Sequence, residues 1–93
     1  MASQMSDTTP GSPRTYAEQL TADVWQQILG TDEVDRADNF FLLGGSSRAA
    51  LAVAAALTER LGAKVPVRLV YQYSDLSAFA EQLPQAKEGA LLP

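Results

Sequence analysis

An alanine-rich run in the middle of the chain constrains the fold more than any other feature. Six alanines stand among positions 49–56, inside a segment that follows Gly45 and stops at Gly62. Alanine has the highest helix propensity, and glycine is a common residue just beyond a helix C-terminus. The sequence therefore predicts a long helix here. With 93 residues in all, the chain has room for only one small domain around it.

The larger apolar residues of this predicted helix indicate which face is buried. They are Leu51, Val53, Leu57 and Leu61, and we expect them to contact the core. The other face, around positions 48, 49, 52 and 56, is small and almost uncharged.

A second amphipathic helix is predicted upstream of this run. Its apolar residues recur every three to four positions, which is the spacing of one helix face. The face consists of Leu20, Val24 and Ile28, widened by Ala17 and Trp25. The helix starts near Tyr16, where Thr15 can cap it and Glu18 can complete a capping box, and Gly30 ends it.

The stretch 31–45 between these helices is polar and acidic until it closes on large apolar residues and two glycines. We expect a long loop held to the core by Phe40, Phe41 and Leu43. A loop of this length is uncommon in a compact domain unless it serves a function.

After Gly62, the segment Val65-Pro66-Val67 interrupts any helix, and residues 68–73 are long enough for a short helical turn or two. Ser74 or Asp75 is expected to cap a last helix. The expected buried face of that helix is Leu76, Phe79 and Leu83. The sequence thus predicts an all-α fold, a small bundle of three main helices and one short helix.

Both ends of the chain differ in composition from this body. Residues 1–14 are rich in Ser, Thr, Gly and Pro without apolar periodicity, and residues 84–93 likewise show no pattern. Such segments bury too little surface to offset the entropy of ordering them. We therefore expect a flexible leader over 1–14, a folded domain over 15–83 and a flexible tail over 84–93.

Composition removes several classes of function. The chain has no cysteine and no histidine, which excludes a thiolate nucleophile, a Ser-His-Asp triad and the usual zinc sites. The formal net charge is −4 and the basic residues are scattered, which argues against nucleic acid. No apolar run reaches the roughly 20 residues of a membrane span, and no signal peptide is visible. We expect a cytoplasmic protein that binds neither membrane nor nucleic acid.

The acidic residues of the loop do not fit a calcium site. Counted from Asp32, the position that needs glycine is Ala37, and the position that needs a bidentate glutamate is Leu43. We therefore expect solvated acids and no metal.

Two serines follow the double glycine, where the long helix begins. Ser46 or Ser47 can cap this helix by accepting a backbone N–H. A phosphate group would also be favoured there, because free N–H groups and the positive end of the helix dipole face it. Both interpretations can hold together if one serine caps and its neighbour carries a phosphoryl group.

The run DNFFLLGGSS, residues 38–47, resembles the signature D-x-F-F-x-L-G-G-(H/D)-S of peptidyl carrier proteins, the thiolation domains of nonribosomal peptide synthetases. The resemblance implies an acyl-carrier-like bundle. It places on Ser47 the attachment of 4'-phosphopantetheine, taken from coenzyme A, with Gly45 and Ser46 flanking it. The terminal thiol would hold an aminoacyl or peptidyl thioester, so the chain needs no catalytic residue of its own.

The same resemblance implies several partner enzymes: a phosphopantetheinyl transferase, an adenylation enzyme, and condensation or tailoring enzymes. A small, almost uncharged helix face suits docking with them. We expect the partner surface to comprise Arg48, Ala49 and Ala52 of the helix with Phe41 and Leu43 of the loop. We also expect a free-standing, monomeric carrier.

Two positions depart from the family pattern. Ser46 replaces the usual His or Asp, and Arg48 replaces an aliphatic residue. Three alternatives remain open. An aryl or polyketide acyl carrier is one, although such carriers typically show an acidic helix here, and this helix has only Glu59. The others are a non-covalent helical adaptor and a hydrolase that uses Ser47 without a visible base.

Overall fold

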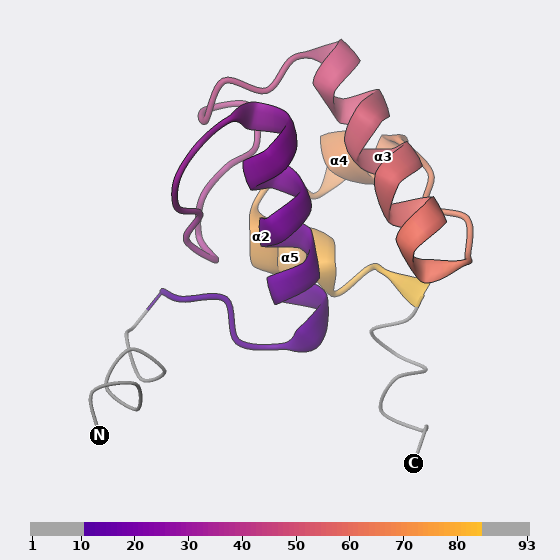
Figure 1. Ribbon diagram of the computed structural model, residues 1–93, viewed down its shortest axis with the longest axis horizontal. Coiled ribbons are helices and arrows are strands. Elements are labelled where there is room, and N and C mark those ends of the chain that lie inside the picture. The colour runs from indigo at the N-terminus through magenta and orange to yellow at the C-terminus, as the bar shows by residue number, and fades with distance from the viewer. Residues whose placement is uncertain (1–10, 85–93) are drawn as a thin grey trace.

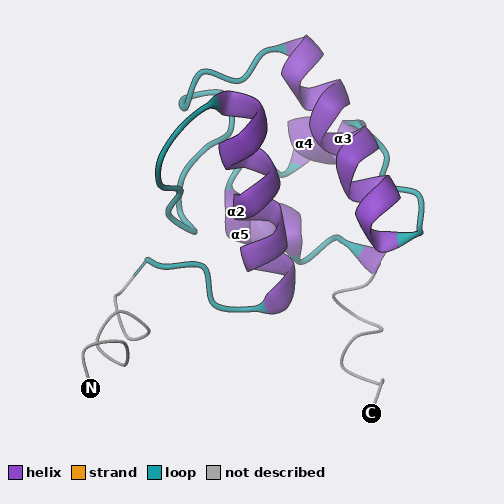
Figure 2. Cartoon of the chain, viewed as in Figure 1, coloured by secondary structure: helices purple, strands orange, loops and turns teal. Residues whose placement is uncertain are grey.

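The computed structural model describes residues 11–84 and places four helices among them (Figure 1). They are α2 (Tyr16–Leu29), α3 (Ser47–Leu61), α4 (Arg68–Gln72) and α5 (Leu76–Ala80). The described part has no strand beyond a single antiparallel bridge between Asn39 and Asp75 (Figure 2). The predicted all-α bundle is therefore confirmed. Helix α2 packs against α3 and α5, and α4 packs against α5.

Helix α2 begins and ends where the sequence predicts. The Thr15 hydroxyl accepts the Glu18 N–H at 3.0 Å, and Gly30 closes the helix in the left-handed conformation, with φ of 72°. The Glu18 side chain bonds one residue further upstream than a capping box requires. The Glu18 carboxylate accepts the backbone N–H of Arg14 at 2.7 Å, so it fixes the residue that precedes the cap.

Helix α3 also has the predicted bounds, because Ser46 caps its start and Gly62 ends it with φ of 68°. The expected burial is wrong for Leu51, whose side chain is 59% exposed. The smaller side chains of Ala50 and Ala54 face the core instead. They allow α3 to approach its neighbours closely.

The C-terminal helices are both short, and α5 ends at Ala80, three residues before the expected end. Leu83 is nevertheless fully buried, because the turn after α5 brings it back to the core. Asp75 is the N-cap residue of α5, one of the two predicted alternatives, but neither side chain makes a cap hydrogen bond to this helix. The Ser74 hydroxyl donates to the Val70 carbonyl at 2.9 Å, so it closes α4. Asp75 stands at the start of α5, but its side chain accepts the amide of Asn39 at 3.4 Å.

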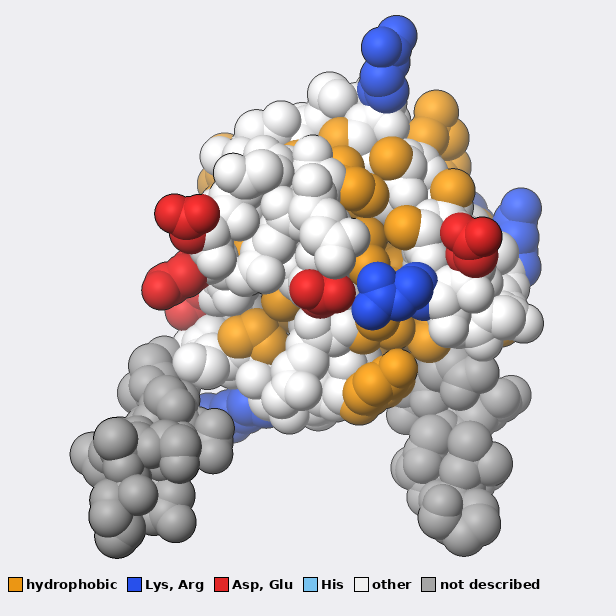
Figure 3. Space-filling view, viewed as in Figure 1, with side chains coloured by type: hydrophobic (Ala, Val, Ile, Leu, Met, Phe, Trp, Pro, Cys, Tyr) orange, Lys and Arg blue, Asp and Glu red, His pale blue; other side chains and the backbone are white. Residues whose placement is uncertain are grey.

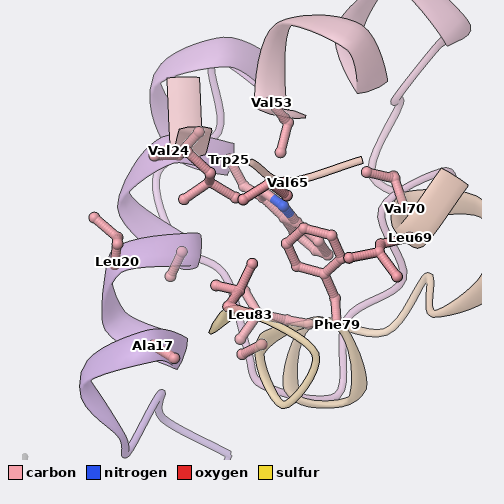
Figure 4. Close-up of a cluster of buried hydrophobic side chains, with 14 of the residues drawn as sticks. Ala17, Leu20, Val24, Trp25, Val53, Val65, Leu69, Val70, Phe79 and Leu83 are labelled. Atoms are coloured by element: carbon pink, nitrogen blue, oxygen red, sulfur yellow. The ribbon is translucent and has the colours of Figure 1, made fainter. Parts of the chain in front are cut away.

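Aromatic rings form the centre of the core. Trp25 is fully buried, and its ring meets Phe40 edge-on with centroids 5.1 Å apart and Phe79 at 6.4 Å. Figure 4 shows Trp25 and Phe79 surrounded by aliphatic side chains from three helices and from the turn after α5. Phe40 therefore ties the long loop to the core, as predicted, while Phe41 and Leu43 are only half-buried against it.

Residues 1–10 and 85–93 lie outside the described part, so most of the expected leader and tail does too, and the domain limits stay a prediction. Within the expected leader, the Gly11 carbonyl accepts the Arg36 N–H at 2.7 Å, which places Gly11 against the α2–α3 loop. No helix in residues 11–84 is long and apolar enough to cross a membrane.

Candidate functional site: the start of helix α3

Hydrogen bonds within the loop that leads to α3 set the path of its backbone. The Asn39 side-chain oxygen accepts the N–H groups of Phe41 and Leu42 at 2.9 and 3.1 Å. The Gly45 N–H then bonds to the Phe40 carbonyl at 3.0 Å. Gly44 has a φ of 105°, which residues with a side chain rarely adopt. This backbone conformation explains why position 44 is a glycine.

Gly45 is required for a different reason, namely space. A Cβ atom on Gly45 would overlap the ring of Phe40 and stand 2.8 Å from the Phe40 carbonyl oxygen. Phe40 cannot easily give way, since it has no exposed surface and packs against Trp25. The core thus sets the position of the backbone immediately before the two serines.

The two serines have different roles at the helix start. Ser46 is the N-cap, and its hydroxyl accepts the Ala49 N–H at 3.1 Å. Ser47 is the first residue of α3 and is exposed. Within residues 11–84 its hydroxyl has no hydrogen-bond partner, and the N–H groups of Ser47 and Arg48 have no acceptor. The structure therefore leaves one free hydroxyl beside two free donors.

The residues expected to form the partner surface differ in exposure. Arg48 and Ala52 are exposed on α3, whereas Phe41, Leu43 and Ala49 are half-buried and pack on the core. Phe41 stacks on the ring of Tyr71 with centroids 5.3 Å apart and planes 28° apart.

Sequence reasoning missed three exposed apolar side chains near this part of the bundle. Leu42 is 87% exposed, Leu51 is more than half exposed, and Tyr71 is about half exposed. The exposure of Leu42 could have been predicted, because Leu42 occupies the variable position of the motif. Its neighbours Phe41 and Leu43 are half-buried. The stack of Tyr71 on Phe41 brings α4 to the loop and has no counterpart in the sequence pattern.

The carboxylates of the acidic loop contact the loop's own backbone. Asp35 accepts the Ala37 N–H at 2.7 Å, and Asp38 accepts the Asp35 N–H at 2.8 Å, so these carboxylates stabilise turns of the loop itself. In the described residues, no three acidic side chains are grouped in a way that could hold a metal ion.

A second feature that the sequence did not reveal is the ion pair between Glu18 and Arg36. The guanidinium donates twice to the carboxylate, at 2.7 and 3.1 Å, and Glu18 is almost fully buried. The hydrogen bonds from Arg36 lower the pKa of Glu18, and backbone hydrogen bonds from Arg14 and Thr15 act in the same direction. The pair joins α2 to the loop that carries Phe40.

The fold and the site together define a small helical carrier domain, with an exposed serine at the start of a helix. Residues 19–83 match the model of the phosphopantetheine attachment site family. The chain is 41% identical over 77 residues to a linear gramicidin synthase of Brevibacillus parabrevis, an alignment that covers 83% of this chain and 1% of the relative. It is 35% identical over 81 residues to tyrocidine synthase 3 of the same organism, with coverage of 84% and 1%. It therefore spans only a very small part of these curated relatives.

Solved structures show the same fold. One is a peptidyl carrier protein in complex with the phosphopantetheine transferase Sfp and coenzyme A, with a TM-score of 0.71, 28% identity and coverage of 75% of this chain and 91% of that chain. Another is a nonribosomal PCP domain, with a TM-score of 0.69, 28% identity and coverage of 76% and 91%. The chain belongs to the phosphopantetheine attachment site family, as a carrier domain of the nonribosomal peptide synthetase type.

Proposed function

We propose that Ser47 is the residue that carries 4'-phosphopantetheine and that the arm holds an aminoacyl or peptidyl thioester. The observation that carries this assignment is the difference in hydrogen bonding between the two serine hydroxyls. The Ser46 hydroxyl is engaged as a cap at 3.1 Å from the Ala49 nitrogen, whereas Ser47 is exposed and its hydroxyl is unpartnered within the described residues.

The surroundings of Ser47 suit a phosphodiester. The unpaired N–H groups of Ser47 and Arg48 lie at the positive end of a 15-residue helix, which favours a negative charge there. In the attachment reaction the Ser47 oxygen displaces adenosine 3',5'-bisphosphate from coenzyme A, and its proton passes to a base of the transferase. The bound arm would supply the thiol that this cysteine-free chain lacks.

The chain itself is proposed to be non-catalytic. Within residues 11–84 no general base lies within hydrogen-bonding distance of the Ser47 hydroxyl, and a serine nucleophile needs one. This observation speaks against the hydrolase alternative.

We propose that a phosphopantetheinyl transferase, an adenylation enzyme and condensation or tailoring enzymes dock beside Ser47. Arg48 and Ala52 are the exposed members of the expected surface, and Ala49, Phe41 and Leu43 support it from below. A carrier similar to this chain was solved with the transferase Sfp, and another with a docking domain. We further propose that the domain acts as a cytoplasmic monomer, and the free-standing state stays a prediction.

The experiment uses the full chain, a phosphopantetheinyl transferase and coenzyme A, followed by an adenylation enzyme with ATP and a panel of amino acids. Intact-protein mass spectrometry should show one added arm, then one aminoacyl group that hydroxylamine removes. A chain that gains no mass would instead be a non-covalent adaptor. A chain that gains the arm but takes no amino acid, and instead accepts an aryl acid from an adenylation enzyme or a malonyl group from malonyl-coenzyme A and an acyltransferase, would belong to another carrier class.

A further inference from the structure

Two open hollows meet at Lys64, in the connection between α3 and α4. The first, of about 390 Å³, lies along α3 and includes Ala55 and Val67 in its walls. The second, of about 300 Å³, lies beside α4 and includes Arg68 and Tyr73. Lys64 lines both, so the two hollows adjoin at this residue; together they are named the Lys64 surface.

The cations of this surface are not neutralised. Residues 60–74 contain three basic residues and no acidic residue. Arg60 pairs with Asp23 at 3.4 Å, but Lys64 and Arg68 are exposed and have no carboxylate partner among residues 11–84. The Arg68 guanidinium only donates to Gln72, at 3.1 Å. Within the described part of the chain, two unpaired positive charges therefore border these hollows, and the hollow along α3 has mainly apolar walls.

The Lys64 surface begins at Leu51, about one turn along α3 from the proposed attachment residue, and extends well away from it. Thr58, which lines the first hollow, follows Ser47 by 11 positions on the same helix. At 1.5 Å per residue this corresponds to roughly 16 Å along the helix axis. Lys64 lies beyond that, past the end of α3.

We propose that the Lys64 surface binds a peptide segment of a partner protein in which acidic and apolar side chains are mixed. Apolar side chains of the segment would fill the hollows, and its carboxylates would face Lys64 and Arg68. Two adjoining hollows that share a cationic wall fit an elongated segment better than a compact small molecule. This binding goes beyond the attachment of the arm at Ser47 and does not depend on it.

The charge distribution favours a protein segment over a nucleic acid. The whole chain has a net charge of −4 although this surface is basic, so a long polyanion would meet repulsion elsewhere. Figure 3 shows acidic side chains at the left, over the loop after α2, and also at the centre and right, with basic side chains at the top, centre and right and one at the lower left. A short acidic segment can use the basic region alone.

The test selects peptides from a random display library on the full chain and measures the affinity of the most enriched one by fluorescence anisotropy. Enriched peptides should carry an excess of Asp and Glu next to large apolar residues. Lys64→Glu should weaken binding at least about tenfold, a change of about 1.4 kcal/mol. Arg14→Glu is the matched control, because it changes the charge equally at an exposed residue before α2 that lines neither hollow, and it should alter affinity less than about twofold.

Three results would overturn the proposal: selected peptides without an acidic excess, an unchanged affinity in Lys64→Glu, or equal losses in both variants. Lys64→Gln repeats the measurement should the reversed charge alter the helical circular dichroism. Loading with coenzyme A is followed by mass in the same samples. If the arm fails to attach while the peptide still binds, only the proposed function is contradicted. If the arm attaches while the peptide does not bind, only this inference is contradicted.

Discussion

The ring of Phe40 fills the space that a side chain on Gly45 would need, and the same ring packs edge-on against Trp25 at 5.1 Å. The hydrophobic core therefore fixes the backbone one residue before the helix cap. The position of Ser47 follows from this contact, because Ser46 and Ser47 continue directly from Gly45 into α3.

Gly45→Ala should lower the free energy of unfolding by about 1–3 kcal/mol, because the added methyl group overpacks a buried ring. Gly45 does not have a positive φ, so the cost is steric. Urea unfolding followed by Trp25 fluorescence measures it. If the double variant Phe40→Leu/Gly45→Ala shows simple addition of the two single losses, the steric account is contradicted.

Gly44→Ala provides a contrasting case. No atom lies within 4 Å of a Cβ placed on Gly44, yet its φ is 105°. The expected loss, about 1–3 kcal/mol, comes from backbone strain. Unlike the loss in Gly45→Ala, it should not change when Phe40 is made smaller. Relief by Phe40→Leu would show that the two glycines share one cause.

Ser46→Ala removes the cap of α3 and should cost about 1 kcal/mol, while Ser46→Asp should restore most of that stability. Thermal unfolding by circular dichroism at about 222 nm checks both variants. Equal stability of Ser46→Ala and the natural chain would mean that the bond to the Ala49 N–H does not support the helix.

Glu18→Gln should change the pH dependence of stability. The pKa of Glu18 is lowered in the folded state, mainly by the hydrogen bonds from Arg36. Its stabilising contribution is thus full above the unfolded pKa of about 4.3 and is lost as the pH falls through the folded value. At neutral pH the variant should lose about 1–3 kcal/mol, because a buried partner of Arg36 is removed.

Urea titrations between about pH 7 and pH 3 follow this effect. The natural chain should lose stability toward acid pH more steeply than Glu18→Gln. Glu59→Gln, the same substitution at an exposed position of α3, is the matched control and should leave the slope nearly unchanged. Parallel curves for the natural chain and Glu18→Gln would contradict the assigned pKa shift.

Ala52→Glu tests the proposed docking face. Ala52 is exposed on α3, so a glutamate there should leave the fold stable within about 0.5 kcal/mol. It should slow transferase-catalysed loading, because a longer charged side chain keeps the partner from approaching closely. Loading rates are measured from intact mass, with Gln27→Glu on the exposed side of α2 as the control. Unchanged rates with unchanged helicity would exclude Ala52 from the docking face.

The two long helices and their caps could be predicted from the sequence because those signals are local. Thr15, Gly30 and Gly62 act on backbone groups a few residues away, so their roles can be seen without knowing the fold. The burial of Phe40 could also be predicted, since a large apolar residue closes a polar loop.

The errors and omissions concern contacts between distant parts of the chain. Burial of Leu51 is expected because leucine is more hydrophobic than alanine. In the structure the close packing of α3 brings Ala50 and Ala54 to the core instead. The Glu18–Arg36 pair joins residues 18 positions apart, and no periodicity signals it.

The choice between Ser46 and Ser47 is a separate case. In the sequence both serines can cap the helix, and only the resemblance to peptidyl carrier proteins favours Ser47 as the attachment residue. The cap geometry adds physical support, because the bond from the Ala49 N–H engages Ser46.

The most direct test of the central claim is the intact mass of Ser46→Ala and Ser47→Ala after incubation with coenzyme A and a phosphopantetheinyl transferase. Both variants must first show the helical circular dichroism of the natural chain. Ser46→Ala should gain one phosphopantetheine arm, and Ser47→Ala should gain none. An arm on Ser47→Ala, or its loss in a folded Ser46→Ala with an intact Ser47, would contradict the assignment of Ser47.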